Sequence, residues 1–242
     1  MFDHVTIRVA DPAASEAFYS AVMAALGHAA TWSDDGLAEW DEFGFSPVTA
    51  DQPLTRGVHV GFAAPSREHV DAFWRAGAEA GGRDDGAPGL RPQYREDYYG
   101  GFLRDPDGNS VEAVHHGGMQ GGMIDHLWVR VADLAAAEAF YATIAPHAGF
   151  GPAERPGAGR RRFRGAGGSL TLVTGVPTEH LHLAFPATDD GTVDAFWRTA
   201  TLAGYRDNGG PGERPEYHPG YYGAFVLDPD GNNAEVVNHN RP

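Results

Sequence analysis

The chain begins with a strict alternation of polar and apolar residues, HVTIRV at 4–9. A period of two is typical of a strand with one buried face. The pattern then changes, because apolar residues recur at helical spacing from Phe18 to Leu26. Asp11 and Gly27 are suited to begin and end this helix, since Asp caps N-termini and Gly tolerates the left-handed conformation.

The next hundred positions continue this mixture of strands and helices. The pattern predicts strands around 37–41 and 43–49, a strand at 57–64, a helix near 66–80, and strands near 98–104 and 109–115. A strand, a helix and further strands therefore occur twice in succession. This order predicts an α+β fold class.

The second half of the chain repeats the whole pattern. Residues 2–19 match residues 124–141 in length and type. Between 89–116 and 212–239, 16 of 28 positions are identical. Similarity at this level indicates an internal duplication rather than a shared composition.

The duplication predicts two modules, 1–117 and 124–242, joined by a Gly-rich linker at 118–123. A chain of 242 residues is long enough for two domains of ordinary size. Since each copy contains two similar units, we expect four units in the whole chain.

Composition excludes several classes of function. The 33 acidic and 18 basic residues give a net charge of −15, which repels nucleic acid and anionic membranes. No stretch approaches the ~20 apolar residues of a membrane helix, and the start lacks a leader pattern. With no cysteine, disulfides and thiolate sites are excluded. We expect a cytoplasmic protein that acts on a small molecule.

The polar residues of the strands carry more information, because the same types recur at the same places in both copies. Alternation places six of them on the face that points away from the helix-packed core: His4, His59, Glu112, His126, His182 and Glu235. A solvated face explains one such histidine. The repeated set of two His and one Glu is better explained by a divalent metal such as Fe, Mn, Ni, Co or Zn.

Three motifs in this order, DHVTIRVAD…AFY, VHVGF and DPDGNSVE, resemble the vicinal oxygen chelate superfamily of glyoxalases, bleomycin-resistance proteins and extradiol dioxygenases. The resemblance covers nearly the whole chain, twice. It implies four βαβββ units, in pairs, whose curled mixed sheets surround metal clefts. The family's ligand positions map onto two sets: His4, His59 and Glu112, and His126, His182 and Glu235.

Two arrangements of these ligands stay open. Each set could lie within one module, or His4 could join His182 and Glu235 across a swapped interface. The chain is accordingly expected to be a monomeric pseudo-dimer or a homodimer.

The resemblance implies an enzyme in which a divalent metal chelates vicinal oxygens of a small substrate, as in lyases and isomerases of this group. The alternatives are an extradiol-type dioxygenase, a thiol transferase for antibiotic resistance, and a metal-free protein that sequesters a small molecule. Glyoxalase I has a further carboxylate that serves as metal ligand and base. The corresponding strands here, 43–49 and 167–174, contain no glutamate. Six intact ligand positions argue against sequestration.

Candidate catalytic groups flank the last strand of each copy, namely Tyr99 in the first and His218 and Tyr222 in the second. The same loops also carry Tyr94, Arg95, Tyr98, Tyr217 and Tyr221. A Tyr-rich loop that packs its rings at the sheet edge is the alternative interpretation. His116 and His239 share the strand face of the two Glu residues and are candidates to support a metal ligand.

One difference separates the copies. The hairpin after the first helix is acidic in the first copy (32–43) and basic in the second (159–165). Clustered charges are usually only solvated. If the hairpins line two clefts, however, Arg160 to Arg164 favour an anionic substrate in one of them.

Overall fold

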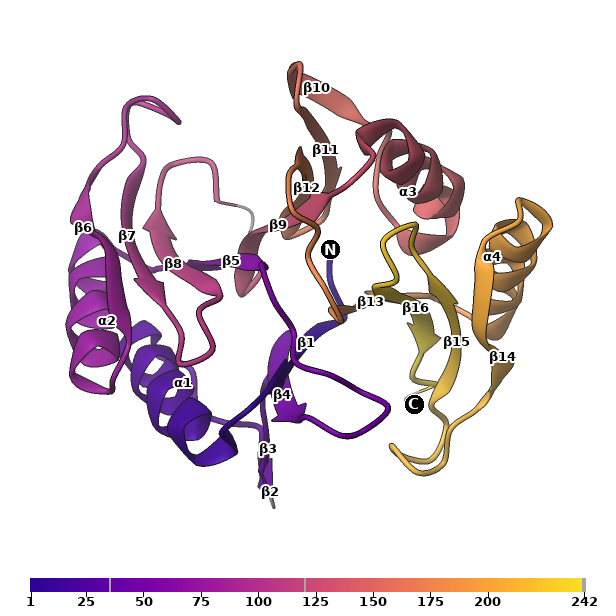
Figure 1. The fold of residues 1–242 in the computed structure, drawn as a ribbon, viewed down its shortest axis with the longest axis horizontal. Helices are drawn as coiled ribbons and strands as arrows, with labels where there is room; N and C mark the ends of the chain where they lie inside the picture. The colour runs from indigo at the N-terminus through magenta and orange to yellow at the C-terminus, as the bar shows by residue number, and fades with distance from the viewer. Residues whose placement is uncertain (35, 120, 241–242) are drawn as a thin grey trace.

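The protein consists of two eight-stranded mixed sheets, each covered by helices (Figure 1). The computed structural model describes residues 1–34, 36–119 and 121–240. The first sheet has the spatial order β14 (Arg206–Glu213), β15 (Tyr222–Leu227), β16 (Asn233–Asn238), β13 (His182–Pro186), β1 (His4–Val9), β4 (Phe43–Pro47), β3 (Leu37–Trp40) and β2 (Trp32–Asp34). The second has the order β10 (Glu154–Gly157), β11 (Arg160–Gly165), β12 (Gly168–Thr174), β9 (Ile124–Val131), β5 (His59–Ala63), β8 (Ser110–His115), β7 (Tyr99–Arg104) and β6 (Arg83–Leu90). The predicted α+β fold of βαβββ units is confirmed.

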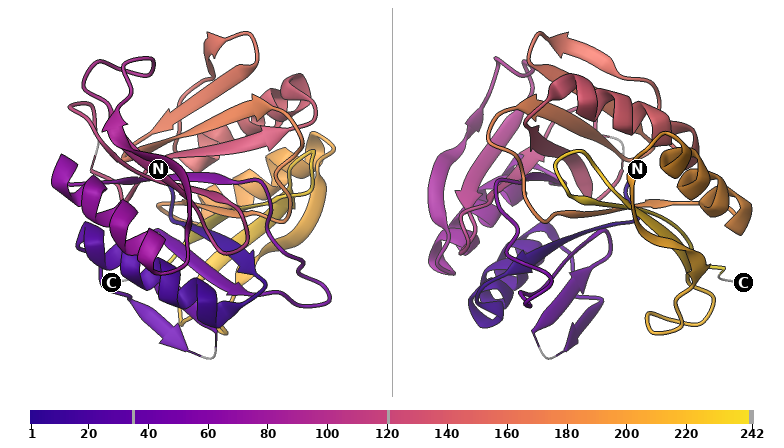
Figure 2. Two further views of the ribbon diagram at one scale, coloured as in Figure 1. Left: turned by 60° about the vertical axis from the view of Figure 1, so that its left-hand side comes forward. Right: turned by 45° about the vertical axis from the view of Figure 1, so that its right-hand side comes forward.

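The helices form two pairs on the outside of the sheets. They are α1 (Pro12–Leu26), α2 (Arg67–Glu79), α3 (Leu134–Ala148) and α4 (Asp190–Leu202). Helix α1 packs against α2, and α3 packs against α4, as the two helix pairs in Figures 1 and 2 show. Among the described residues, no helix is long and apolar enough to cross a membrane.

Each sheet combines strands from both copies of the repeat. Strands β1–β4 of the first copy share a sheet with β13–β16 of the second, and β5–β8 share the other sheet with β9–β12. The antiparallel pairs β1–β13 and β5–β9 join the copies. Of the two arrangements that the sequence leaves open, the structure therefore has the swapped one. The division into modules at 1–117 and 124–242 stays a prediction from the repeat.

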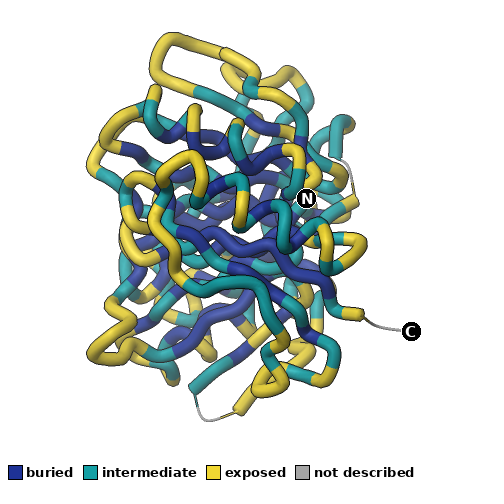
Figure 3. The backbone as a smooth tube through the Cα atoms, turned by 90° about the vertical axis from the view of Figure 1, so that its right-hand side faces the viewer, coloured by how far each residue is buried: buried dark blue, intermediate teal, exposed yellow. Residues whose placement is uncertain are grey.

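Strand alternation separates a dry face from a polar one, as predicted. In β1 the apolar residues Val5, Ile7 and Val9 are fully buried, whereas the polar residues between them are partly exposed. Figure 3 shows buried residues concentrated in the interior of the molecule and exposed residues at its periphery. The dry face packs on the helices, so the polar face is left for a site.

The end signals of the first helix are confirmed. The Asp11 side chain accepts a hydrogen bond from the Ala14 N–H at 3.1 Å, and Gly27 ends the helix with a φ of 89°. Because a residue with a Cβ is strained at such a positive φ, glycine defines this end.

Two of the edge strands, β6 and β14, do not follow the alternation of hydrophobic and polar residues. Strands β6 and β14 have the sequences RDDGAPGL and RDNGGPGE and are largely exposed. Their pairing with β7 and β15 contains register shifts, so no regular alternation is required of them. This explains why the polar and apolar positions do not predict them.

The repeated Asp-Pro-Asp-Gly-Asn turn connects each last hairpin to a helix. The hydroxyl of Tyr19 in α1 donates to buried Asp105 at 2.8 Å, and Tyr141 in α3 donates to Asp228 at 3.3 Å. The N–H of Asn109 also donates to Asp105, at 2.7 Å. The turn is thus structural, and it fixes the start of the strand that carries the glutamate.

Candidate metal centres

Three side chains of the second sheet converge to form what we call the first centre: His59 of β5, Glu112 of β8 and His126 of β9. Nε2 of His59 lies 3.1 Å from Oε2 of Glu112 and 3.1 Å from Nε2 of His126. The distance from Nε2 of His126 to Oε2 of Glu112 is 3.3 Å. Because β8, β5 and β9 are neighbours in the sheet, pairing between the copies assembles this group.

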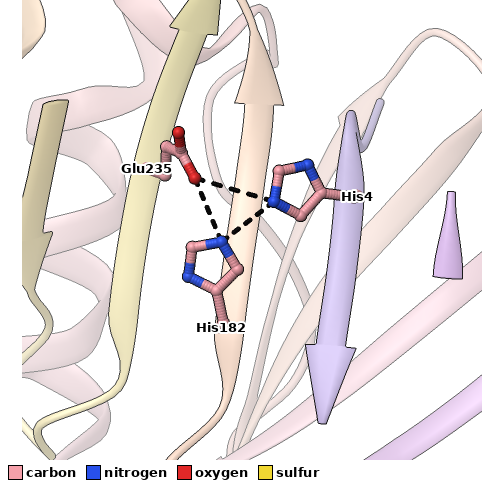
Figure 4. A group of neighbouring side chains, drawn as sticks. All are labelled: His4, His182 and Glu235. Carbon is pink, nitrogen blue, oxygen red and sulfur yellow. Dashed lines mark hydrogen bonds and ion pairs between the residues drawn. The ribbon is translucent and has the colours of Figure 1, made fainter. Parts of the chain in front are cut away.

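The second centre has the same composition and lies in the first sheet. His4 of β1, His182 of β13 and Glu235 of β16 point toward one another in Figure 4. Nε2 of His182 is 3.0 Å from Nε2 of His4 and 3.0 Å from Oε2 of Glu235. The distance from Nε2 of His4 to Oε2 of Glu235 is 3.6 Å. One ligand position thus comes from one copy and two from the other.

Both groups fit the requirements of a divalent metal ion. Bonds of about 2.1 Å from one ion place neighbouring ligand atoms roughly 3.0–3.4 Å apart in octahedral or tetrahedral geometry. Five of the six measured separations lie at 3.0–3.3 Å, and the sixth is 3.6 Å. Two imidazoles and a carboxylate on one side of an ion leave further coordination positions for a substrate.

The orientation of the rings also favours a cation. Nδ1 of His126 donates to Asp125 at 2.9 Å, and Nδ1 of His4 donates to Asp3 at 2.9 Å. Since a carboxylate only accepts, the Nε2 lone pair of each neutral ring points into its centre. Lone pairs and a carboxylate then face one another, and a positive charge stabilises them. The other Nδ1 atoms contact neutral groups at 2.8 Å, His59 with Ser110 and His182 with Asn233.

Asp3 and Asp125 are candidate site residues that the sequence interpretation missed. Nε2 of His116 lies 3.2 Å from Asp125, and Nε2 of His239 lies 2.9 Å from Asp3. These two histidines therefore contact the carboxylates that orient His126 and His4, and their supporting role toward a metal ligand stays a prediction. The doubled Asp-His pair in FDH and IDH was the available signal.

A tyrosine holds the second oxygen of each glutamate. The Tyr98 hydroxyl donates to Oε1 of Glu112 at 2.6 Å, and Tyr221 donates to Oε1 of Glu235 at 2.6 Å. A Cβ added at Gly100 would lie 2.6 Å from Oε1 of Glu112, so this glycine makes room for the carboxylate. Oε2 alone is left to face the histidines.

The residues predicted as catalytic lie elsewhere. The hydroxyls of Tyr99 and Tyr222 donate to Asp71 of α2 and Asp194 of α4, at 2.8 and 2.9 Å. Both rings pack on the helix side of the sheet, opposite the histidines. His218 lies beside the second centre without joining it: its Nε2 contacts Nδ1 of His239 at 2.8 Å, and its ring packs edge-on against Tyr221. The structure brings their neighbours Tyr98 and Tyr221 to the centres instead.

The first centre accommodates positive charge. Burial alone would raise the pKa of Glu112, but the close contacts with His126 and His59, when they carry protons, hold this pKa at about 2. Burial disfavours a charged His126, yet Asp125 and Glu112 outweigh it and raise the pKa of His126 to about 9. Burial lowers the pKa of His59. A proton on His126 and a divalent cation would therefore compete for one place.

A cavity of about 880 Å³ opens onto the first centre. His59, Glu112 and His126 line it together with Trp128 and residues of strand β11. A volume of this size accommodates a metabolite-sized ligand.

Comparison with known proteins agrees with this fold. The chain belongs to the Glyoxalase/Bleomycin resistance protein/Dioxygenase superfamily, whose family model matches residues 1–113 and 123–236. The superfamily resemblance noted in the sequence is therefore confirmed. No curated protein matches the sequence.

Two solved structures of glyoxalase I show the same fold at low identity, and a third structure matches half of the chain. Glyoxalase I from Zea mays is 18% identical, with a TM-score of 0.69 over 98% of this chain and 92% of that chain. Its V278E mutant is 17% identical, with a TM-score of 0.71 over 98% and 92%. A glyoxalase/bleomycin resistance protein from Albidiferax ferrireducens T118 is 36% identical over 48% of this chain and 99% of its own, with a TM-score of 0.45.

Proposed function

We propose that the protein is a metal-dependent enzyme that chelates two neighbouring oxygens of a small substrate, with lyase or isomerase chemistry. The observation that supports this most strongly is the first centre itself. Two imidazole nitrogens and one carboxylate oxygen lie 3.1–3.3 Å apart at the wall of a cavity of about 880 Å³. The donors occupy one side only, which leaves room for a bidentate ligand.

The residues at the first centre have different roles in the proposed reaction. A bound divalent ion supplies a Lewis acid that polarises substrate oxygens and stabilises developing negative charge. His59, Glu112 and His126 would hold it. Asp125 orients His126, and Tyr98 directs Oε2 of Glu112 inward by holding Oε1. The second centre offers the same set through His4, His182 and Glu235.

An extradiol-type dioxygenase is the second candidate. The two-His, one-carboxylate donor set, which is also that of non-haem Fe(II) oxygenases, supports it. Oxygen uptake by the iron-loaded protein on catechols, abolished in Glu112→Gln, would favour this reaction over the lyase or isomerase type.

Metal analysis of protein purified without chelators tests the proposal. We expect two divalent ions per chain in the wild type and one in either Glu112→Gln or Glu235→Gln. Glu79→Gln on the exposed surface of α2 is the matched control and should keep both ions. A wild-type protein that binds no stoichiometric metal would contradict the proposal and favour sequestration.

A further inference from the structure

Strand β11 presents alternate arginines to the cavity of the first centre. Arg160, Arg162 and Arg164 line this cavity. Between them, Phe163 is buried in the core and Arg161 forms an ion pair with Glu138 of α3. The basic hairpin thus has one face committed to packing and one face turned to the site.

The arginines that line the cavity differ in whether a protein group already binds them. Arg164 pairs with Glu154 at 3.0 Å, and the Arg160 guanidinium lies 4.8 Å from the centre of the Trp128 ring. Arg130, Arg91, Arg95 and Arg104 bind Gly57, Ala87, Asp97 and Asp85, respectively. The guanidinium of half-buried Arg162 has no hydrogen bond or ion pair with any residue in 1–34, 36–119 or 121–240.

A second unsatisfied polar group lies beside Arg162. Thr171 of β12 is 1% exposed, lines the same cavity, and its hydroxyl has no hydrogen-bond partner among the described residues. Thr171 pairs in register with Arg162 on one side and with Trp128 on the other. A buried hydroxyl without a partner is costly, and its position next to an unpaired guanidinium points to an absent ligand.

The second centre has the opposite charge at the corresponding position. There, Gly44 of β4 pairs with Thr6 on one side and with Glu39 on the other. Since Thr6 is the counterpart of Trp128 in the repeat, Glu39 stands where Arg162 stands at the first centre. Glu39 also acts electrostatically on His4. Arg8 and Arg130 occupy equivalent positions in the two copies, so each centre has one of them. The difference in charge between the centres therefore comes from the hairpin strand.

The structure assigns an anion subsite to Arg162, Arg160 and Thr171, which binds a carboxylate or phosphate group of the substrate at the first centre and not at the second. This assignment rests on the proposed function, because it names a substrate class for that site. Strand β11 lies two strands from β9, or about 10 Å. An arginine side chain and a small substrate together span that distance to His126.

Titration of metal-free protein tests the subsite separately from the metal. The probes are inorganic phosphate and malonate, added at constant ionic strength and followed by calorimetry. We expect one anion per chain, with affinity on the order of tenfold weaker in Arg162→Gln, because a charge-assisted hydrogen bond is lost. Arg161→Gln changes the net charge equally on the opposite face and should bind as the wild type does. The tighter probe identifies the anionic group.

Thr171→Val provides an independent readout. Removal of an unpartnered buried hydroxyl should leave the melting temperature of the anion-free protein unchanged or higher, while anion affinity falls about threefold. Equal anion affinity in wild type and Arg162→Gln, an equal loss in Arg161→Gln, or binding of neither probe would overturn the subsite. Two metal ions per chain in Arg162→Gln, with weakened anion binding, would support both the subsite and the proposed function.

Discussion

At the scale of single residues, the hydrogen bond from Tyr98 to Glu112 determines which carboxylate oxygen faces the histidines. Tyr98→Phe frees Oε1, so the carboxylate is no longer held in the orientation that the centre requires. We expect roughly tenfold weaker metal binding at the first centre and no change at the second. Competition with a chromophoric chelator measures both affinities.

Tyr99→Phe is the matched control for this variant. It removes a hydroxyl from the adjacent position, but that hydroxyl donates to Asp71 on the helix side. Metal affinity should therefore stay at the wild-type value. An equal loss of metal in both variants would show that the loop, rather than the contact with Glu112, supports the centre.

The raised pKa of His126 predicts a pH-dependent stability of the metal-free protein. A histidine whose folded pKa, about 9, exceeds its ordinary value of 6.5 stabilises the fold fully below pH 6.5. This contribution is lost as pH rises from 6.5 to 9. The melting temperature should fall over that range, as measured by circular dichroism.

His126→Gln is the control for this pH effect. The variant should lose less stability between pH 6.5 and 9, with a residual loss from His4, whose pKa is raised by Asp3 and Glu235 against the effect of burial. A wild-type melting temperature that is constant or rising over this range would contradict the assignment.

The sequence predicted the side chains that converge in the two centres better than the residues that hydrogen-bond to them, for a physical reason. Strand parity depends only on local geometry, so it placed His4, His59 and Glu112 on one face. The choice between Tyr98 and Tyr99 depends on where β7 begins and on its pairing with β8. Those are long-range properties, and the hydrophobic pattern does not define that boundary.

At the scale of elements, the hydrogen bond between Tyr19 and Asp105 connects α1 to the turn before β8. Tyr19→Phe leaves a buried carboxylate without this donor, which should reduce the free energy of unfolding by about 1–3 kcal/mol. Urea denaturation measures the change. Tyr141→Phe removes a longer hydrogen bond, 3.3 Å rather than 2.8 Å, and should cost less. The reverse order would argue against this contact as the main link.

Helices and central strands were predictable because their signals are local, whereas the edge strands were not. The Asp11 cap and Gly27 define α1 within the chain itself. Strands β6 and β14 exist because β7 and β15 offer unpaired backbone groups to them. Their Gly- and Pro-containing sequences carry no alternation that would reveal this.

At the scale of the whole molecule, each centre combines side chains from both copies, and pairs of substitutions can test whether they bind metal together. His4→Gln and His182→Gln should each remove one metal equivalent, and together they should remove no more than one. His4→Gln combined with His59→Gln should remove both, although these two residues lie in the same copy. Elemental analysis distinguishes this pattern from centres contained within single copies, which would reverse the two double-variant results.

The pairing of copies could not be read from the sequence, because both arrangements place identical residue types at each centre. Only the antiparallel pairs β1–β13 and β5–β9 distinguish them. These pairs join segments that lie far apart in the chain, and their apolar patterns are interchangeable between copies.

The shared sheets also bear on how the two centres could diverge. In a symmetric assembly of two separate, identical chains, any substitution would appear at both centres at once. Here one continuous chain encodes both, so a change such as glutamate at 39 and arginine at 162 affects one centre alone. Fusion thus gives the molecule two centres with the same donors that selection can adjust one at a time.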